Sequence, residues 1–140
     1  MPQSTPLRIA YLDESGTVTP FRGTECFLII AVVAGSERAM RACALHVNRL
    51  RRRARLSPGR ELKATLATPE QVLRLLTAIA EEDIAIVAVV LDKRGVRRAP
   101  DDPEDWYREA VALACWHCAN RWPSLSITLD KRYTKPALRQ

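Results

Sequence analysis

Three aspartates follow short apolar runs in this sequence, and their positions are the strongest sign of chemistry in the chain. Asp13 follows RIAYL, Asp92 follows AIVAVVL and Asp130 follows LSITL. The carboxyl ends of parallel strands meet at one edge of a sheet, so we expect three carboxylates to gather there. Crowded carboxylates repel one another unless they share a proton or bind a cation. The spacing therefore predicts a divalent-metal site.

The same aspartates also have a purely structural interpretation. Aspartate often ends a strand because it favours turns, and a following Lys or Arg neutralises its charge. Asp13 continues as Glu14-Ser15-Gly16, whereas the other two aspartates are followed by basic pairs, Lys93-Arg94 and Lys131-Arg132. The residue pattern leaves both interpretations open.

Alternating strands and helices are expected to position these residues. The patterns predict strands over 7–13, 25–34, 84–92 and 124–130, and helices over 36–56, 68–83 and 102–122. The run 84–92 is continuously apolar, which is typical of a strand covered on both faces. We expect the first, third and fourth strands to run parallel through helical crossovers, with the second antiparallel to the first. The predicted fold class is α/β, with a mixed, largely parallel sheet.

Length and composition indicate one domain over residues 1–140, large enough to bury a core without a disulfide. No apolar run reaches the roughly 18 residues of a membrane span, and the first residues do not resemble a signal peptide. The four cysteines fall inside predicted strands and helices, and Cys115 and Cys118 lack a second pair of zinc ligands, so we expect core packing. Neither His46 nor His117 is assigned a catalytic role. We expect a cytoplasmic protein with no membrane partner.

Arginine carries most of the net charge of +6, because 18 of the 22 basic residues are arginines. Eight arginines and no acidic residue lie between positions 38 and 60. On the predicted helix 36–56 they fall largely off the apolar stripe, which gives a dense positive surface that attracts phosphate. The candidate nucleic-acid contacts are Arg49, Arg51, Arg52, Arg53 and Arg55. No aromatic residue is interleaved for base stacking, and a solvated face or a protein contact is the alternative.

Several of these motifs together resemble a known family. YLDESG at 11–16, the apolar strand at 25–34, Glu61-Leu62-Lys63 and a strand ending in an aspartate are similar to the family catalogued as domain of unknown function 3800, which is related to the ribonuclease H-like fold. The resemblance implies a nuclease that holds two Mg²⁺ or Mn²⁺ ions for phosphodiester cleavage. It implies Asp13 as the bridging ligand, with Glu61 and Asp92 as further ligands. Lys63 would either orient the scissile phosphate or neutralise Glu61. Asp130 is a candidate fourth ligand.

The sequence departs from this family in two places. A third strand in the first antiparallel unit is not evident, and the chain ends ten residues after Asp130, without the final helix that would carry another acid. A non-catalytic basic module that binds nucleic acid or a protein therefore stays open as the alternative function. We also predict a homodimer, because the last strand has no following helix to cover it, with Trp106, Trp116 and Trp122 as candidate anchors.

Overall fold

The structure is a computed structural model that describes residues 7–57 and 59–129. The chain divides into two compact units. One, here called the sheet unit, contains the described residues up to Val33 and from Ala85 onward. The other, the helical unit, spans Ala34–Ile84.

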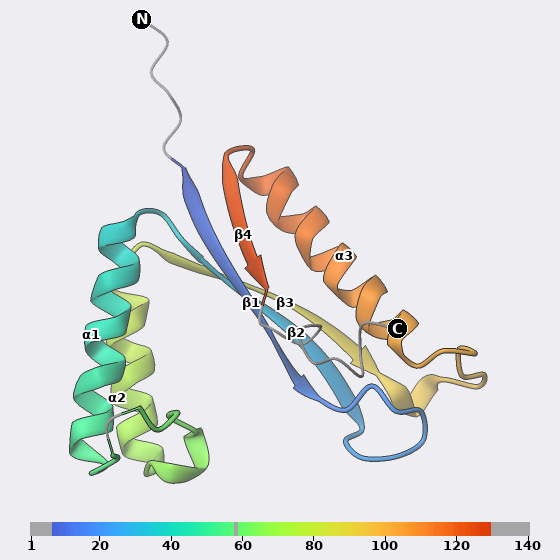
Figure 1. The fold of residues 1–140 in the computed structure, drawn as a ribbon, viewed down its shortest axis with the longest axis horizontal. Coiled ribbons are helices and arrows are strands. Elements are labelled where there is room, and N and C mark those ends of the chain that lie inside the picture. The colour runs from blue at the N-terminus through green and yellow to red at the C-terminus, as the bar shows by residue number, and fades with distance from the viewer. Residues whose placement is uncertain (1–6, 58, 130–140) are drawn as a thin grey trace, which may run out of the picture. The chain divides into compact units, whose positions relative to one another are not determined.

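The sheet has four strands in the order β3-β2-β1-β4 (Figure 1). They are β1 (Arg8–Gly16), β2 (Cys26–Ala34), β3 (Ile84–Asp92) and β4 (Leu125–Leu129). β1 and β4 pair in parallel, with Leu12 opposite Leu129. β2 and β3 are antiparallel, because the Gly35 backbone N–H donates to Asp83 O and the Lys93 N–H to Glu25 O, each at 2.9 Å.

The prediction of a largely parallel sheet is wrong. The sheet is mixed and mostly antiparallel, and β1 and β3 run in the same direction only because β2 lies antiparallel between them. The physical reason lies in the connection between β2 and β3. Gly35 and Asp83, at the two ends of this connection, are hydrogen-bonded to each other, so the helical residues between them form an insertion in a β-hairpin.

The core of the sheet unit lies between one face of the sheet and α3 (Glu104–Arg121), which runs alongside β4 in Figure 1. Alternate residues of β2, such as Phe27 and Ile29, are buried against it, as strand geometry requires. Small side chains of α3, Ala110 and Ala114, are also buried, which lets the helix backbone approach the strands. The ring centroids of Phe27 and Tyr107 lie 6.2 Å apart across this layer.

The expectation that β3 is covered on both faces is wrong. Its residues alternate between half-buried and exposed, and Ile86 and Val90 are 61% and 56% exposed. Val87 and Val89, between them, pack against the core. The continuous apolar run 84–92 therefore forms a strand with only one buried face.

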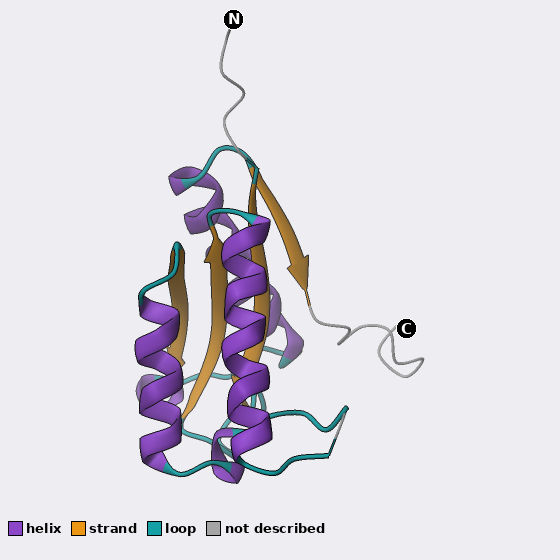
Figure 2. Cartoon of the chain, turned by 90° about the vertical axis from the view of Figure 1, so that its left-hand side faces the viewer, coloured by secondary structure: helices purple, strands orange, loops and turns teal. Residues whose placement is uncertain are grey.

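The helical unit contains α1 (Glu37–Arg53), the short 3-10 helix η1 (Ala64–Leu66) and α2 (Pro69–Ala80). α1 and α2 lie side by side (Figure 2). Ser36 caps α1 by accepting a hydrogen bond from Ala39 N at 3.1 Å. Thr68 and Gln71 form a capping box at the start of α2, which confirms the start predicted from the sequence.

Two tryptophans named as dimer anchors, Trp106 and Trp122, are half-buried, whereas Trp116 is 61% exposed. The guanidinium groups of Arg8 and Arg121 lie 5.9 and 5.2 Å from the Trp122 ring centroid, a cation–π arrangement. Trp122 is thus engaged within the sheet unit, and the homodimer stays a prediction.

Candidate functional site

Asp13 lies on β1, next to the parallel partner strand β4. Strand alternation turns Leu12 toward the core and Asp13 to the exposed side. Its carboxylate accepts a hydrogen bond from the Glu14 backbone N–H at 2.8 Å, and none of the described Lys or Arg side chains pairs with it. β1 continues to Gly16, so the prediction that Asp13 ends its strand is wrong by three residues.

The register of β1 and β4 identifies which strand lies beside Asp13. Leu12 faces Leu129, the last residue of β4. Asp130 follows Leu129 in the sequence, but it lies outside the described residues.

Asp92 ends β3 and forms an ion pair with Arg94, two residues further along the chain. Its carboxylate accepts hydrogen bonds from the Arg94 backbone N–H at 3.0 Å and from Arg94 Nε and Nη2 at 2.9 and 2.7 Å. The hydrogen bonds from the Arg94 side chain, and then the one from its backbone, lower the pKa of Asp92 to about 2. The same pair raises the pKa of Arg94.

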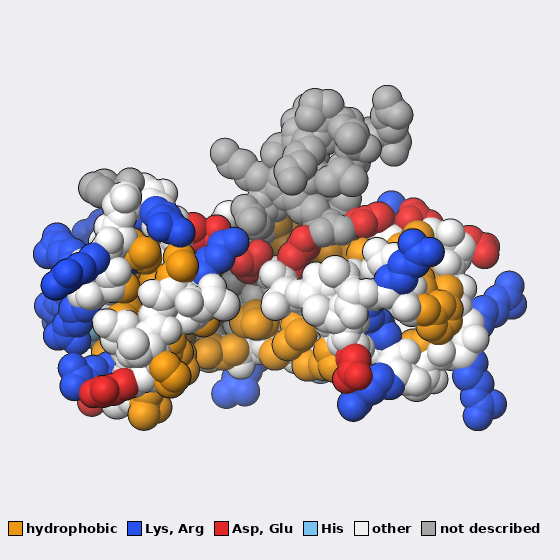
Figure 3. All heavy atoms as spheres, turned by 90° about the horizontal axis from the view of Figure 1, so that it is seen from below, with side chains coloured by type: hydrophobic (Ala, Val, Ile, Leu, Met, Phe, Trp, Pro, Cys, Tyr) orange, Lys and Arg blue, Asp and Glu red, His pale blue; other side chains and the backbone are white. Residues whose placement is uncertain are grey.

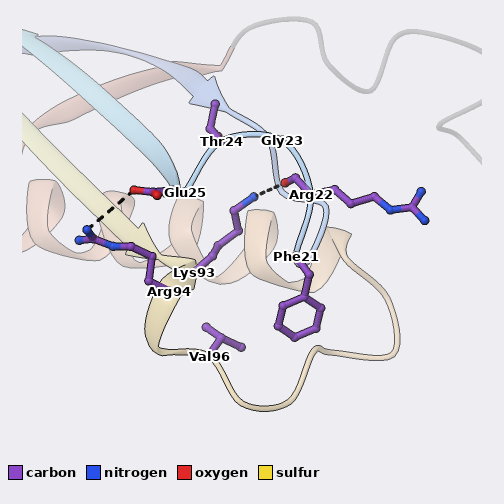
Figure 4. A pocket seen from close by; sticks show the side chains of 8 residues that line it. All are labelled: Phe21, Arg22, Gly23, Thr24, Glu25, Lys93, Arg94 and Val96. Carbon is purple, nitrogen blue, oxygen red and sulfur yellow. Dashed lines mark hydrogen bonds and ion pairs between the residues drawn. The ribbon is translucent and has the colours of Figure 1, made fainter.

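β1 and β3 run in the same direction but are not paired with each other, so the expected grouping of Asp92 with Asp13 at one edge of the sheet stays a prediction. β2 lies between β1 and β3, and the Asp92 oxygens are already bound by a cation. Arg94 also lies 3.8 Å from Glu25 (Figure 4), so it pairs with two carboxylates. Asp92 is thus the partner of Arg94 in this structure, and its role as a metal ligand stays a prediction.

Lys93 holds the loop between β1 and β2 and does not neutralise an aspartate. It is 6% exposed, and its ammonium donates to three backbone carbonyls, those of Thr17, Thr19 and Arg22, at 3.0, 3.0 and 2.8 Å. Figure 4 shows its side chain reaching from the end of β3 to this loop. The sequence alone favours Lys93 and Arg94 equally as partners of Asp92. The structure distinguishes them, because Lys93 is buried and bonded to the loop whereas Arg94 is exposed and paired with Asp92.

The β1–β2 loop has a second set of bonds that fixes its path. Thr17 and Thr24 face each other, and the backbone N–H of each donates to the hydroxyl of the other, at 2.9 and 3.1 Å. Gly16 adopts φ +88°, and a Cβ there would clash with the Cys26 carbonyl oxygen. The glycine of the Asp-Glu-Ser-Gly motif is therefore required by the turn itself.

Glu61 and Lys63 belong to the helical unit, in the exposed segment before η1. The Lys63 carbonyl accepts the Leu66 N–H at 2.9 Å and so begins that 3-10 turn. The predicted roles of Glu61 as a metal ligand and Lys63 as a phosphate-orienting group stay predictions.

The arginines named from the sequence lie near the carboxyl end of α1 and just beyond it. Arg49, Arg52, Arg53 and Arg55 are exposed, while Arg51 is half-buried and donates weakly to the Ser57 carbonyl at 3.4 Å. Figure 3 shows Lys and Arg side chains gathered over the helical unit, at its left end. Arg55 adopts φ +56°, which ends the helical path.

A pocket of about 200 Å³, which the sequence alone does not predict, opens between α1 and α2. Arg49 and Arg53 of α1 and Arg74 of α2 line it together with His46. His46 Nε2 lies 3.1 Å from Glu82 Oε1, and Arg74 pairs with Glu70 at 2.9 Å. The matching helical spacing of Arg49 and Arg53, four residues apart, could have indicated that both lie on one face.

The described residues do not by themselves make a metal centre. Within 7–57 and 59–129 there is no group of three or more His, Cys, Asp or Glu side chains that could hold an ion. Asp13 fits as one oxygen ligand, and the rest of a complete set is not found in this part of the chain. The cysteines are free thiols, and burial raises the pKa of Cys43, Cys115 and Cys118.

Comparisons of the chain with protein-family models, with curated proteins and with solved structures found no match. In the described part of the chain, no helix has the length and apolar character needed to cross a bilayer.

Proposed function

We propose that this chain is a metal-dependent nuclease with a ribonuclease H-like fold, in which Asp13 is a ligand of Mg²⁺ or Mn²⁺. The observation that carries this proposal is the sheet topology. β3, β2 and β1 are successive antiparallel neighbours, and β4 then joins β1 in parallel after α3. The family resemblance implies such a three-stranded antiparallel unit, and β3, which the sequence predicts as a parallel strand, pairs with β2 as the third strand of that unit.

This topology changes the assignment of the third acid. The parallel strand that follows the antiparallel unit is β4, so the aspartate directly after it in the sequence is Asp130 and not Asp92. We therefore propose Asp13 and Asp130 as ligands and give Asp92 a structural role with Arg94. Glu61 is kept as a proposed ligand on the Glu-Leu-Lys motif alone.

When bound, the metal ions of such enzymes activate water and stabilise the leaving oxygen. The described residues would bind the phosphates of the nucleic acid and hold the loop next to Asp13 in place. The exposed arginines of α1 offer charge and paired N–H donors to backbone phosphates. Lys93 fixes the loop that follows the Asp13 motif.

The test is a cleavage assay on single-stranded and duplex RNA and DNA oligonucleotides, with Mg²⁺, Mn²⁺ or a chelator. Asp13→Asn and Asp130→Asn should each abolish cleavage, while Asp92→Asn, the matched control, should keep activity within a few-fold of the parent. Thermal melts show that each variant is folded. Full activity in Asp13→Asn, or cleavage that persists with the chelator, would contradict the proposal.

A second candidate is a non-catalytic module that binds nucleic acid through the α1 arginines. The observation that favours it is the engagement of Asp92 by Arg94 together with the exposed Arg49, Arg52 and Arg53. Binding that falls steeply with salt, without cleavage in either metal and without a rise in melting temperature on Mn²⁺ titration, would favour this candidate.

A further inference from the structure

A pocket of about 310 Å³ lies beside the β1–β2 loop, within the sheet unit (Figure 4). Residues 21–25 of the loop line it from one side, and Lys93, Arg94 and Val96 line it from the other. Its volume is at the lower end of the range for small-ligand sites, enough for a planar group the size of a nucleobase.

Phe21 is the unusual residue of this pocket. Its side chain is 68% exposed, more than any other large apolar side chain among the described residues. Its backbone adopts φ +57°, a conformation that costs free energy for a bulky aromatic residue. An aromatic ring that is both exposed and held in a strained turn is therefore unfavourable for the isolated chain, and such strain concentrates at ligand sites.

The loop that carries Phe21 is held in place from inside. Lys93 donates to the carbonyls of Thr19 and Arg22, the residues on both sides of Pro20-Phe21. In Figure 4 Phe21 and Val96 project on the same side of the Lys93 side chain, so the pocket has two apolar walls. The ring is thus presented by a fixed loop, which lowers the entropy lost when a ligand binds.

Polar and charged groups border these apolar walls. The Glu25 carboxylate and the Arg94 guanidinium lie on the pocket, and Arg97 and Arg98 follow Val96 in the sequence and are exposed. Sites for single-stranded nucleic acid combine an aromatic ring, on which a base stacks, with cationic side chains that bind the neighbouring phosphates. A carboxylate can also accept from the exocyclic amino group of a base.

We propose that this pocket binds an unpaired nucleobase of a single-stranded nucleic acid, stacked on Phe21. The inference rests on the proposed function in one respect, since it names the single-stranded region as the part of the substrate that the sheet unit recognises. It adds the aromatic contact that the arginine helix lacks.

The test is binding of a fluorescent single-stranded oligonucleotide, measured by anisotropy from low to moderate salt with a chelator present, so that no metal-dependent cleavage occurs. Phe21→Ala should weaken binding about five- to 150-fold, the factor that corresponds to the stacking of one base on an aromatic ring. The slope of affinity against salt should not change, because no cation is lost. Phe21→Trp should keep or increase the affinity.

Leu73→Ala is the matched control, because Leu73 is 65% exposed and lies in the helical unit. It should bind as the parent does. An Arg52→Gln/Arg53→Gln double variant should reduce the salt slope, which separates the charge contribution from stacking.

Parent-like binding by Phe21→Ala, an equal loss in Phe21→Trp, or no binding of single strands by the parent chain would overturn the inference. Its failure is distinct from failure of the proposed function. If Phe21→Ala binds normally while Asp13→Asn loses cleavage, the pocket proposal is wrong and the nuclease proposal stands. If the parent binds through Phe21 but never cleaves, the pocket proposal stands and the nuclease proposal is wrong.

Discussion

Replacing Lys93 by methionine tests whether a buried cation organises the β1–β2 loop. Methionine keeps most of the length and apolar stem of the side chain but removes the ammonium group. The variant loses three hydrogen bonds to the carbonyls of Thr17, Thr19 and Arg22. Hydrogen bonds from a charged donor contribute about 1.5–3 kcal/mol each.

The net loss is smaller than the sum of the three. All three carbonyls belong to exposed residues, so water can replace part of what the ammonium provides. Removing the ammonium also removes the cost of burying a charge. We therefore expect Lys93→Met to lower the free energy of unfolding by about 2–4 kcal/mol.

The assay is urea denaturation, with Arg94→Met as the matched control. Arg94 is the next cation along the chain but is exposed, so its loss should lower the free energy of unfolding much less than the loss of the Lys93 ammonium does. Hydrogen exchange should also show faster amide exchange at Thr17 and Thr24 in Lys93→Met, and not in Arg94→Met. Equal stability of the two variants, or unchanged exchange in the loop, would refute the reasoning.

Three further predictions concern single contacts. The ion pair with Arg94 lowers the pKa of Asp92 to about 2, so this pair stabilises the fold at pH values above the ordinary pKa of aspartate, and the stabilisation is lost as the pH falls through the pKa of the folded state. An NMR titration should show a higher pKa of Asp92 in Arg94→Gln, and an unchanged midpoint would count against the pair. Gly16→Ala should lower the free energy of unfolding by about 1–3 kcal/mol, because Gly16 has a left-handed backbone and an added Cβ would clash with the Cys26 carbonyl oxygen. Gly95→Ala, with open space around it, should not lower it, and equal denaturation curves for the two variants would contradict this prediction. Cys118 is fully buried and its pKa is raised by burial, so mass-spectrometric mapping of alkylation should find it labelled after the half-buried Cys26, and early labelling of Cys118 would be inconsistent with the core.

Local features of this fold could be predicted well from the sequence. The span of β3 agrees with the apolar run 84–92, and the caps at Ser36 and Thr68 agree with the signals in their first turns. Each of these depends on residues within one turn or one strand. The pairing of strands could not be predicted in this way, because it depends on which distant segments meet. A long helical segment between two strands usually indicates a parallel crossover, and here it is an insertion between antiparallel neighbours.

In the candidate site, too, local features could be predicted from the sequence, whereas features that depend on distant residues could not. The exposure of the α1 arginines follows from helical periodicity, and the Asp92–Arg94 pair joins residues only two positions apart. The role of Lys93 and the exposure of Phe21 depend on a loop whose path is set by contacts with residues more than 70 positions away. Those contacts leave no periodic signal in the sequence.

The hydrogen bond between Gly35 and Asp83 has a consequence for how this chain could be engineered and how it could have been assembled. It brings the first and the last residues of the helical unit next to each other, so the chain enters and leaves this unit at adjacent positions. A two-residue turn could join β2 directly to β3 without altering the strand order, since antiparallel neighbours need no longer connection. The helical unit, with its arginine-rich helix α1, could therefore be exchanged for another inserted segment while the Asp13 strand and its neighbours keep their pairing.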